Sequence, residues 1–218
     1  MSKKETENSK AQNKTAEGYP EAIAALRRGD VIVFPTETLY GLGADALNSQ
    51  AVEQVFQLKG RDPVNPIPVL VADREMLHAL VADVPEAAQK LIRQFWPGPL
   101  TLVLPARKEI PKPLCNPSGG VGVRISSQAI ATRLVNALGR PLTATSANPS
   151  GKEPARTIPE AKTYFGDQIE VFVDGGKLTA KTGSTVVEVM GDTIKIIRQG
   201  ELNTAELGRV VGQEKVFR

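Results

Sequence analysis

The amino-acid sequence predicts a three-layer α/β protein built on an open, twisted mixed β-sheet with helices packed around it. Strand-like and helix-like segments alternate from residue 20 to residue 211, the pattern of sheets covered by helices. Some strand-like runs, such as residues 31–34, are apolar throughout, as is typical of strands buried on both faces. No internal repeat and no domain boundary follow residue 18, so residues 19–218 are expected to form one domain.

Each expected element carries a local signal. Asn48 precedes an apolar pattern of helical spacing that ends at Gly60, and Gly191 with Asp192 predicts the turn of a hairpin. The expected helices cover residues 20–28, 49–58, 74–81, 85–96, 129–138, 157–165 and 203–211. The expected strands cover residues 31–34, 67–72, 100–104, 121–125, 141–145, 169–173, 184–189 and 193–198.

Composition excludes several classes of chemistry. The chain has 218 residues with one cysteine, Cys115, and one histidine, His78. A disulfide framework, a protein-ligated zinc site and a histidine-based catalytic triad are therefore not expected. A net charge of +3 and a pI of about 9.0 fit a nucleotide, an acidic small molecule or RNA without choosing among them.

The N-terminal segment differs from the rest of the chain. Residues 1–18 mix lysine and glutamate and contain no aliphatic residue larger than alanine apart from Met1, which predicts a disordered tail. This segment lacks the apolar core of a signal peptide, and no apolar run approaches the length of a membrane span. A cytoplasmic protein without membrane contact is expected.

Two cations stand on a stiff connection between an expected helix and an expected strand. Lys59, Gly60 and Arg61 follow the helix, and the prolines at 63 and 66 then restrict the chain. A lysine and an arginine held together suit an anion with several oxygens, such as a polyphosphate or a carboxylate. The alternative is that both are a solvated helix end favoured by the helix dipole.

Further polar groups follow expected strands. Thr38 and Tyr40 come after strand 31–34 and offer neutral hydrogen-bond donors, although a hairpin with Tyr40 packed in the core explains this segment equally well. Arg124 lies in an apolar strand, so it is either paired internally or turned toward a ligand. Residues 146–151 form a turn rich in donors that could wrap an anion or be an ordinary loop.

The segment from Pro105 to Gly120 contains four prolines and many polar residues. A loop of this length and composition is expected to form a flexible cover or a rim.

Seven segments occur in a specific order between residues 20 and 200. They are residues 35–43 (PTETLYGLG), Lys59-Gly60-Arg61 with Asn65-Pro66, residues 97–101 (PGPLT), Val123-Arg124, residues 146–148 (SAN) with Ser150-Gly151, residues 184–187 (STVV) and Arg198. In this order they resemble the YrdC/Sua5 family of threonylcarbamoyl-AMP synthases. The chain ends soon afterwards, as in the short, single-domain form of the family.

The resemblance implies a reaction in which L-threonine, bicarbonate or CO2, and ATP give threonylcarbamoyl-AMP and pyrophosphate. The product would serve the N6-threonylcarbamoyladenosine modification at position 37 of tRNA, through a downstream tRNA threonylcarbamoyl transferase complex. Mg²⁺ is expected to arrive with ATP rather than on a protein cage. The implied fold has a basic concave face, and weak binding of tRNA or double-stranded RNA is possible on it.

The resemblance also implies residue roles. The residues matched to ATP are Lys59, Arg61, Asn65, Ser146, Asn148 and Arg198. The residues matched to L-threonine are Thr38, Tyr40, Arg61, Arg124 and Ser184. Lys59 and Arg61 are expected to be the catalytic pair.

The sequence departs from the family pattern at two positions, where longer members often have a histidine and this chain has Leu70, and where many have a serine and it has Pro154. Two other functions stay open. One is a paralogue of different or lost activity, like the YciO branch or the carbamoyl-adenylate module of hydrogenase maturation. The other is a double-stranded RNA-binding module without catalysis.

Overall fold

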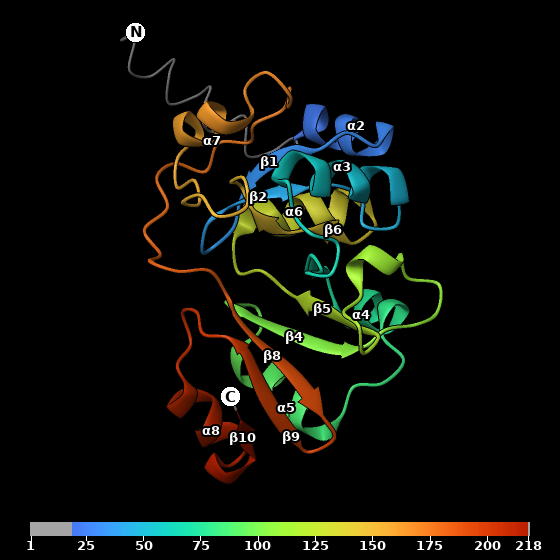
Figure 1. Ribbon diagram of the computed structural model, residues 1–218, viewed down its shortest axis with the longest axis vertical. Coiled ribbons are helices and arrows are strands. Elements are labelled where there is room, and N and C mark those ends of the chain that lie inside the picture. The colour runs from blue at the N-terminus through green and yellow to red at the C-terminus, as the bar shows by residue number, and fades with distance from the viewer. Residues whose placement is uncertain (1–18, 218) are drawn as a thin grey trace, which may run out of the picture.

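The computed structural model of the chain describes residues 19–217 (Figure 1). Its helices are α2 (Pro20–Arg28), α3 (Ser49–Lys59), α4 (Arg74–Leu80), α5 (Glu86–Phe95), α6 (Ala129–Leu138), α7 (Ile158–Phe165) and α8 (Thr204–Val211), with two 3-10 turns, η1 (Lys112–Leu114) and η2 (Gln213–Lys215). Its strands are β1 (Ile32–Pro35), β2 (Tyr40–Gly43), β3 (Val69–Leu70), β4 (Leu100–Pro105), β5 (Gly120–Arg124), β6 (Leu142–Thr143), β7 (Thr145–Ser146), β8 (Thr185–Met190), β9 (Thr193–Arg198) and β10 (Val216–Phe217). The predicted tail, residues 1–18, lies outside the described residues.

The strands form two sheets that follow one another along the long axis of the molecule (Figure 1). A seven-stranded sheet has the order β10-β9-β8-β4-β5-β3-β6 and mixes parallel and antiparallel pairs. A three-stranded antiparallel sheet has the order β1-β2-β7. The predicted mixed sheet surrounded by helices is confirmed, and the smaller sheet comes in addition to it.

The chain passes between the sheets at β6 and β7, which are separated by Ala144 alone. The backbone N–H of Thr143 donates to the carbonyl oxygen of Ala44, just after β2, over 2.9 Å. The two sheets are therefore joined by backbone hydrogen bonds as well as by the covalent chain.

Helix ends follow the capping signals of the sequence. The Asn48 side chain accepts hydrogen bonds from two backbone N–H groups at the start of α3, and Gly60 ends that helix in the left-handed conformation at φ 56°. Gly139 ends α6 in the same way, and Asn203 with Glu206 forms a capping box at α8. These ends fall within one residue of the predicted ones.

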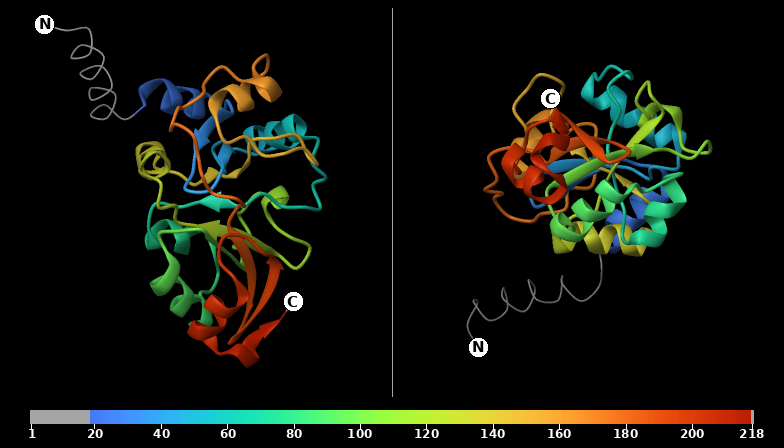
Figure 2. Two further views of the ribbon diagram at one scale, coloured as in Figure 1. Left: turned by 90° about the vertical axis from the view of Figure 1, so that its left-hand side faces the viewer. Right: turned by 90° about the horizontal axis from the view of Figure 1, so that it is seen from below.

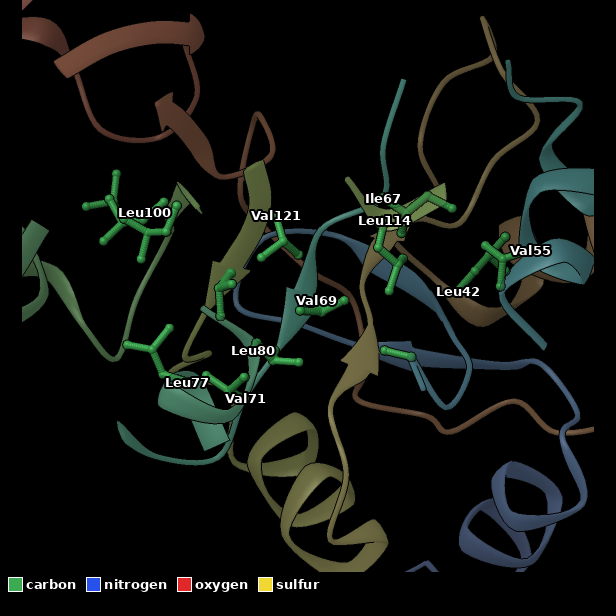
Figure 3. Packing of buried hydrophobic residues seen from close by; sticks show 14 of the residues in the cluster. Leu42, Val55, Ile67, Val69, Val71, Leu77, Leu80, Leu100, Leu114 and Val121 are labelled. Carbon is green, nitrogen blue, oxygen red and sulfur yellow. The ribbon is translucent and has the colours of Figure 1, made fainter. Parts of the chain in front are cut away.

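The core joins both sheets to their helices. Figure 3 shows part of the larger buried cluster, in which Val69 and Val71 at β3 meet Leu77 and Leu80 of α4. Helices α5 and α8 pack against each other on one face of the larger sheet (Figure 2). Within residues 19–217, no helix is long and apolar enough to cross a membrane.

Two predicted segments are corrected. Residues 169–173 form no strand: they run parallel to β1 but make only one bridge to it, Val33 to Phe172, through the hydrogen bonds that Val33 exchanges with Val171 and Val173. The segment from Pro105 to Gly120 is no open cover, because Ile110 and Leu114 are buried in the core. In addition, the predicted strand 141–145 is divided into β6 and β7, one in each sheet.

Candidate active site

Strand directions bring distant residues to one edge of the larger sheet. Strands β4 and β8 are parallel and begin at this edge, whereas β5 and β9 run antiparallel to them and end there. Ser184 precedes β8, Arg124 ends β5 and Arg198 ends β9. Three polar residues that are up to 74 positions apart in the sequence are thus placed together by topology.

The smaller sheet supplies the facing wall. The hydroxyl of Thr36 accepts hydrogen bonds from the backbone N–H groups of Thr38 and Leu39, both at 3.2 Å, and donates to the carbonyl oxygen of Leu39 at 2.7 Å. These bonds close the turn between β1 and β2. The Thr36 and Thr38 hydroxyls are themselves 3.0 Å apart.

Tyr40 is fully buried, which confirms the hairpin interpretation of this segment. Its hydroxyl donates to the carbonyl oxygen of Gly176 over 2.8 Å and accepts the N–H of Gly175 over 2.9 Å. Burial raises the pKa of Tyr40 to about 12, so the phenol stays protonated at neutral pH. Tyr40 therefore ties the chain segment that leads to Ser184 back to β2.

Between the two walls lies a cavity of about 250 Å³. Seven of the predicted site residues line it: Thr38, Tyr40, Arg61, Arg124, Ser146, Ser184 and Arg198. A larger cavity of about 690 Å³ lies elsewhere, along α2 and α3. We take the smaller cavity as the candidate site because it gathers three arginines, whereas the one arginine of the larger cavity, Arg28, is paired with Asp30 at 2.8 Å.

The guanidinium groups of the cavity differ in their partners. Arg61 donates to the carbonyl oxygens of Asn65 and Pro66 at 2.7 and 3.3 Å. Arg198 donates to the carbonyl oxygen of Ser184 at 2.8 Å. The pKa of Arg198 is lowered, first by desolvation and then by the positive charges of Arg124 and Arg61, so Arg198 is repelled by both of these groups.

Arg124 is buried and forms an ion pair with Glu37. The second carboxylate oxygen of Glu37 accepts a hydrogen bond from the hydroxyl of Ser126. Of the two predicted possibilities for Arg124, internal pairing and a ligand-facing position, the structure shows both, because the side chain is paired and also lines the cavity.

Lys59 lies behind the cavity wall. Its ammonium donates to the carbonyl oxygens of Ser146 and Asn148 at 2.6 and 2.7 Å, and its own carbonyl oxygen accepts the N–H of Ser150 at 2.8 Å. Burial, and then the charge of Arg61, lowers the pKa of Lys59 to about 7. Lys59 is a buried anchor of the 146–151 turn and not a solvated helix end.

Besides Lys59, two predicted residues do not line the cavity. Asn65 is exposed on the connection after α3. Asn148 is buried, and its amide nitrogen donates to the carbonyl oxygens of Pro149 and Lys152 at 2.9 and 2.7 Å. Because both neighbours are acceptors, the amide orientation is fixed and its two N–H groups are occupied. Within the described residues, the Asn148 side-chain oxygen has no hydrogen-bond partner.

Sequence reasoning missed several residues of the site. Glu37 pairs with Arg124, and Thr101, buried beneath Ser184, lies with its hydroxyl 2.9 Å from the Ser184 hydroxyl. Both stand inside the motifs that carried the resemblance, which is the signal that could have identified them. Of the two departures from the family pattern, Leu70 is buried in the core, whereas Pro154 lines the cavity.

The donor set of the cavity suits anions. Its lining contains arginines, hydroxyl groups and backbone, with no carboxylate among the lining residues. Within residues 19–217, no three His, Cys, Asp or Glu side chains cluster as they would to hold a metal ion. This set suits a bound anion and does not fit a Mg²⁺ ion held by protein carboxylates.

The chain is similar to proteins of a known family. The Sua5/YciO/YrdC family model, described as telomere recombination, matches residues 24–200. A putative threonylcarbamoyl-AMP synthase of Mycobacterium tuberculosis is 35% identical over 195 residues, which cover 89% of each chain. The threonylcarbamoyl-AMP synthase of Pyrococcus abyssi is 38% identical over 89% of this chain, and the match spans 57% of that protein's length.

Two solved structures are similar in fold. The crystal structure of Pyrococcus abyssi Sua5 in complex with L-threonine has a TM-score of 0.86 and 37% identity, over 90% of this chain and 58% of that one. The crystal structure of Escherichia coli YciO has a TM-score of 0.77 and 28% identity, over 86% of this chain and 91% of that one.

Proposed function

Because this chain belongs to the Sua5/YciO/YrdC family, we propose that it is an L-threonylcarbamoyladenylate synthase, a nucleotidyltransferase that acts on L-threonine, ATP and CO2 or bicarbonate. One observation carries the proposal: the cavity between the sheets gathers three arginines and several hydroxyl groups at the edge where β5 and β9 end. A related protein of the same fold binds L-threonine.

The reaction asks little covalent chemistry of the protein. The threonine amine attacks the carbon of CO2 and releases a proton, which gives a carbamate. A carbamate oxygen then forms a bond to the α-phosphorus of ATP as the bond to the bridging oxygen breaks, so pyrophosphate leaves. Neither step needs a side-chain nucleophile, and the protein contributes position and charge stabilisation.

The phosphate side of the cavity lies at Arg61 and Arg198, whose charges are balanced by no carboxylate contact within the described residues. Ser146 adds a hydroxyl, and Lys59 adds positive charge from behind the 146–151 turn. Asn148 acts by fixing the shape of that turn, because its N–H groups are already bonded to carbonyl oxygens. Asn65 is assigned to the nucleotide by family match alone.

The threonine side lies at Arg124 and Ser184. The guanidinium of Arg124 suits the substrate carboxylate, and Arg61, which lines the same cavity, is available for a shared contact. Thr38 and Tyr40 complete this part of the cavity. Mg²⁺ enters on the phosphates of ATP as part of the substrate, and its charge there offsets the charge of the leaving pyrophosphate.

The product is a mixed anhydride that must be passed to an acceptor. We assign it to a tRNA threonylcarbamoyl transferase complex, which would modify the adenosine at position 37, and we assign the reaction to the cytoplasm. Weak binding of tRNA or double-stranded RNA would serve this transfer.

The test is pyrophosphate release by the purified chain. Release is expected only when ATP, L-threonine and bicarbonate are all present. Turnover without threonine, or none with any amino acid, would instead indicate a paralogue with another activity, as in the YciO branch. Tight, salt-sensitive RNA binding without adenylate formation would indicate the RNA-binding module.

A further inference from the structure

Glu37 is the carboxylate that contacts the arginine cluster of the cavity within the described residues. Arg61 and Arg198 donate to carbonyl oxygens, which carry no full charge, whereas Arg124 donates to Glu37. The three positive charges are thereby divided into one neutralised pair and two uncompensated cations.

The Glu37 carboxylate is also held in place on both sides. One oxygen accepts from Arg124 and the other from the Ser126 hydroxyl. Ser126 is in turn fixed by Gln128, whose backbone N–H donates to the Ser126 hydroxyl oxygen at 3.2 Å at the start of α6. The pair thus connects the turn after β1 to the end of β5 and to the following helix.

The ion pair between Arg124 and Glu37 is buried, so its charges interact strongly. The Arg124 and Glu37 side chains are 5% and 15% exposed, so neither charge is screened by bulk water. Without the carboxylate, Arg124 would be a third uncompensated cation repelled by Arg61 and Arg198, and its guanidinium would lose the contact that orients it.

We propose that Glu37 is a positioning residue that sets both the orientation of Arg124 and the charge distribution of the cavity. The polyphosphate then binds at Arg61 and Arg198, and the substrate carboxylate binds at the remaining N–H groups of the oriented Arg124. Arg124 selects a small carboxylate by geometry and does not compete for the phosphates, because Glu37 cancels its charge. This inference rests on the proposed function for the identity of both substrates.

A specific pattern of kinetic change follows. Glu37→Gln keeps the size of the side chain and an acceptor for Arg124 but removes the charge. We expect the KM for L-threonine to rise by about tenfold, as when one member of a buried charged pair is lost. The affinity for ATP, measured by calorimetry without threonine, should stay unchanged or increase, because the cavity gains net positive charge. A general loss of structure would weaken both substrates together.

Two further variants sharpen the test. Ser126→Ala loosens the carboxylate but keeps its charge, so it should raise the KM for threonine by about two- to fivefold and leave the ATP affinity unchanged. Glu75→Gln removes an exposed carboxylate on α4 that is not part of the cavity lining, and it should change neither value. If Glu37→Gln does not fold, Ser126→Ala gives the decisive measurement.

The outcomes separate this inference from the proposed function. The positioning role would be overturned if Glu37→Gln raised the KM for L-threonine and weakened the affinity for ATP equally. An unchanged KM for L-threonine in this variant would also overturn it. If the wild-type chain makes no adenylate, the proposed function is wrong, but binding of inorganic tripolyphosphate still tests the charge distribution. Glu37→Gln should bind tripolyphosphate at least as tightly as the wild type, and weaker binding by a folded variant would overturn the inference.

Discussion

The ammonium of Lys59 lies 2.6 Å from the carbonyl oxygen of Ser146, which joins the last residue of α3 to the end of β7. A second bond to the carbonyl oxygen of Asn148 closes the contact. The lysine therefore shapes the 146–151 turn as well as placing positive charge behind the cavity.

Replacing this lysine should reduce activity strongly. Lys59→Ala removes the charge and both hydrogen bonds, so we expect turnover to fall at least about tenfold, or ~1.4 kcal/mol of transition-state stabilisation. Lys90→Ala, which removes an exposed lysine paired with Glu86 on α5, should leave turnover unchanged. Near-normal pyrophosphate release by Lys59→Ala would contradict the assignment.

The lowered pKa of Lys59, about 7, predicts a pH dependence of ATP binding. The ammonium form of Lys59 attracts phosphate, so a bound nucleotide raises the pKa of Lys59 above its value of about 7 in the free protein. The affinity for ATP should therefore decrease as the pH rises above about 7. Calorimetry between pH 6 and 8.5 should show this loss in the wild type and not in Lys59→Ala. The titration of the nucleotide itself affects the wild type and Lys59→Ala equally. If the two proteins showed the same dependence of ATP affinity on pH, Lys59 would not be the group responsible.

Arg61 is predicted to serve the phosphates. Arg61→Ala should lower turnover at least about tenfold and weaken ATP binding, and the salt dependence of that binding should decrease with it. Arg93→Ala removes an exposed arginine on α5 outside the cavity lining and is the matched control. Equal behaviour of the two variants would exclude Arg61 from the site.

The Tyr40 hydroxyl fixes the chain beside the cavity. Tyr40→Phe loses the bonds to Gly175 and Gly176, which should cost about 1–2 kcal/mol and lower the Tm by a few degrees. The KM for threonine should rise as well, because the segment leading to Ser184 loses an anchor. Tyr164→Phe on α7, a half-buried tyrosine away from the cavity, tests the loss of a phenol alone. If Tyr40→Phe and Tyr164→Phe changed the Tm and the KM for threonine equally, Tyr40 would have no specific role beside the cavity.

Thr101 is expected to affect threonine binding by orienting the hydroxyl of Ser184. Thr101→Val keeps the shape of the side chain and removes the hydroxyl 2.9 Å from that of Ser184, so the serine loses one orienting partner. We expect the KM for threonine to rise by about two- to tenfold with little change for ATP, the range for one hydrogen bond. Thr163→Val on α7, whose hydroxyl binds the carbonyl oxygen of Pro159, should have no effect. An unchanged KM in Thr101→Val would mean that Ser184 needs no such support.

Local signals in the sequence predicted the helices well because capping and periodicity are local. Asn48, Gly60 and Gly139 each occupy the helix end that their chemistry favours. The strand predicted at residues 169–173 was wrong because an apolar pattern reports burial, whereas a strand also needs a run of hydrogen bonds to a neighbouring strand, and these residues make a single bridge to β1.

The site was predictable as a set of residues but not as an arrangement. Motif order identified most of the lining, including Arg124 and Ser184. It could not show that Asn148 has its N–H groups occupied or that Glu37 neutralises Arg124, because these facts depend on side-chain partners from other elements. The roles of the individual residues stay predictions until they are measured.

Ala144 alone separates β6, in one sheet, from β7, in the other, and this crossing lies in the cavity wall. A molecule bound there would contact both sheets and hold them together. Amide hydrogen exchange should then slow in β1 and β2 at the same time as in β8 and β9, although these strands lie at opposite ends of the chain.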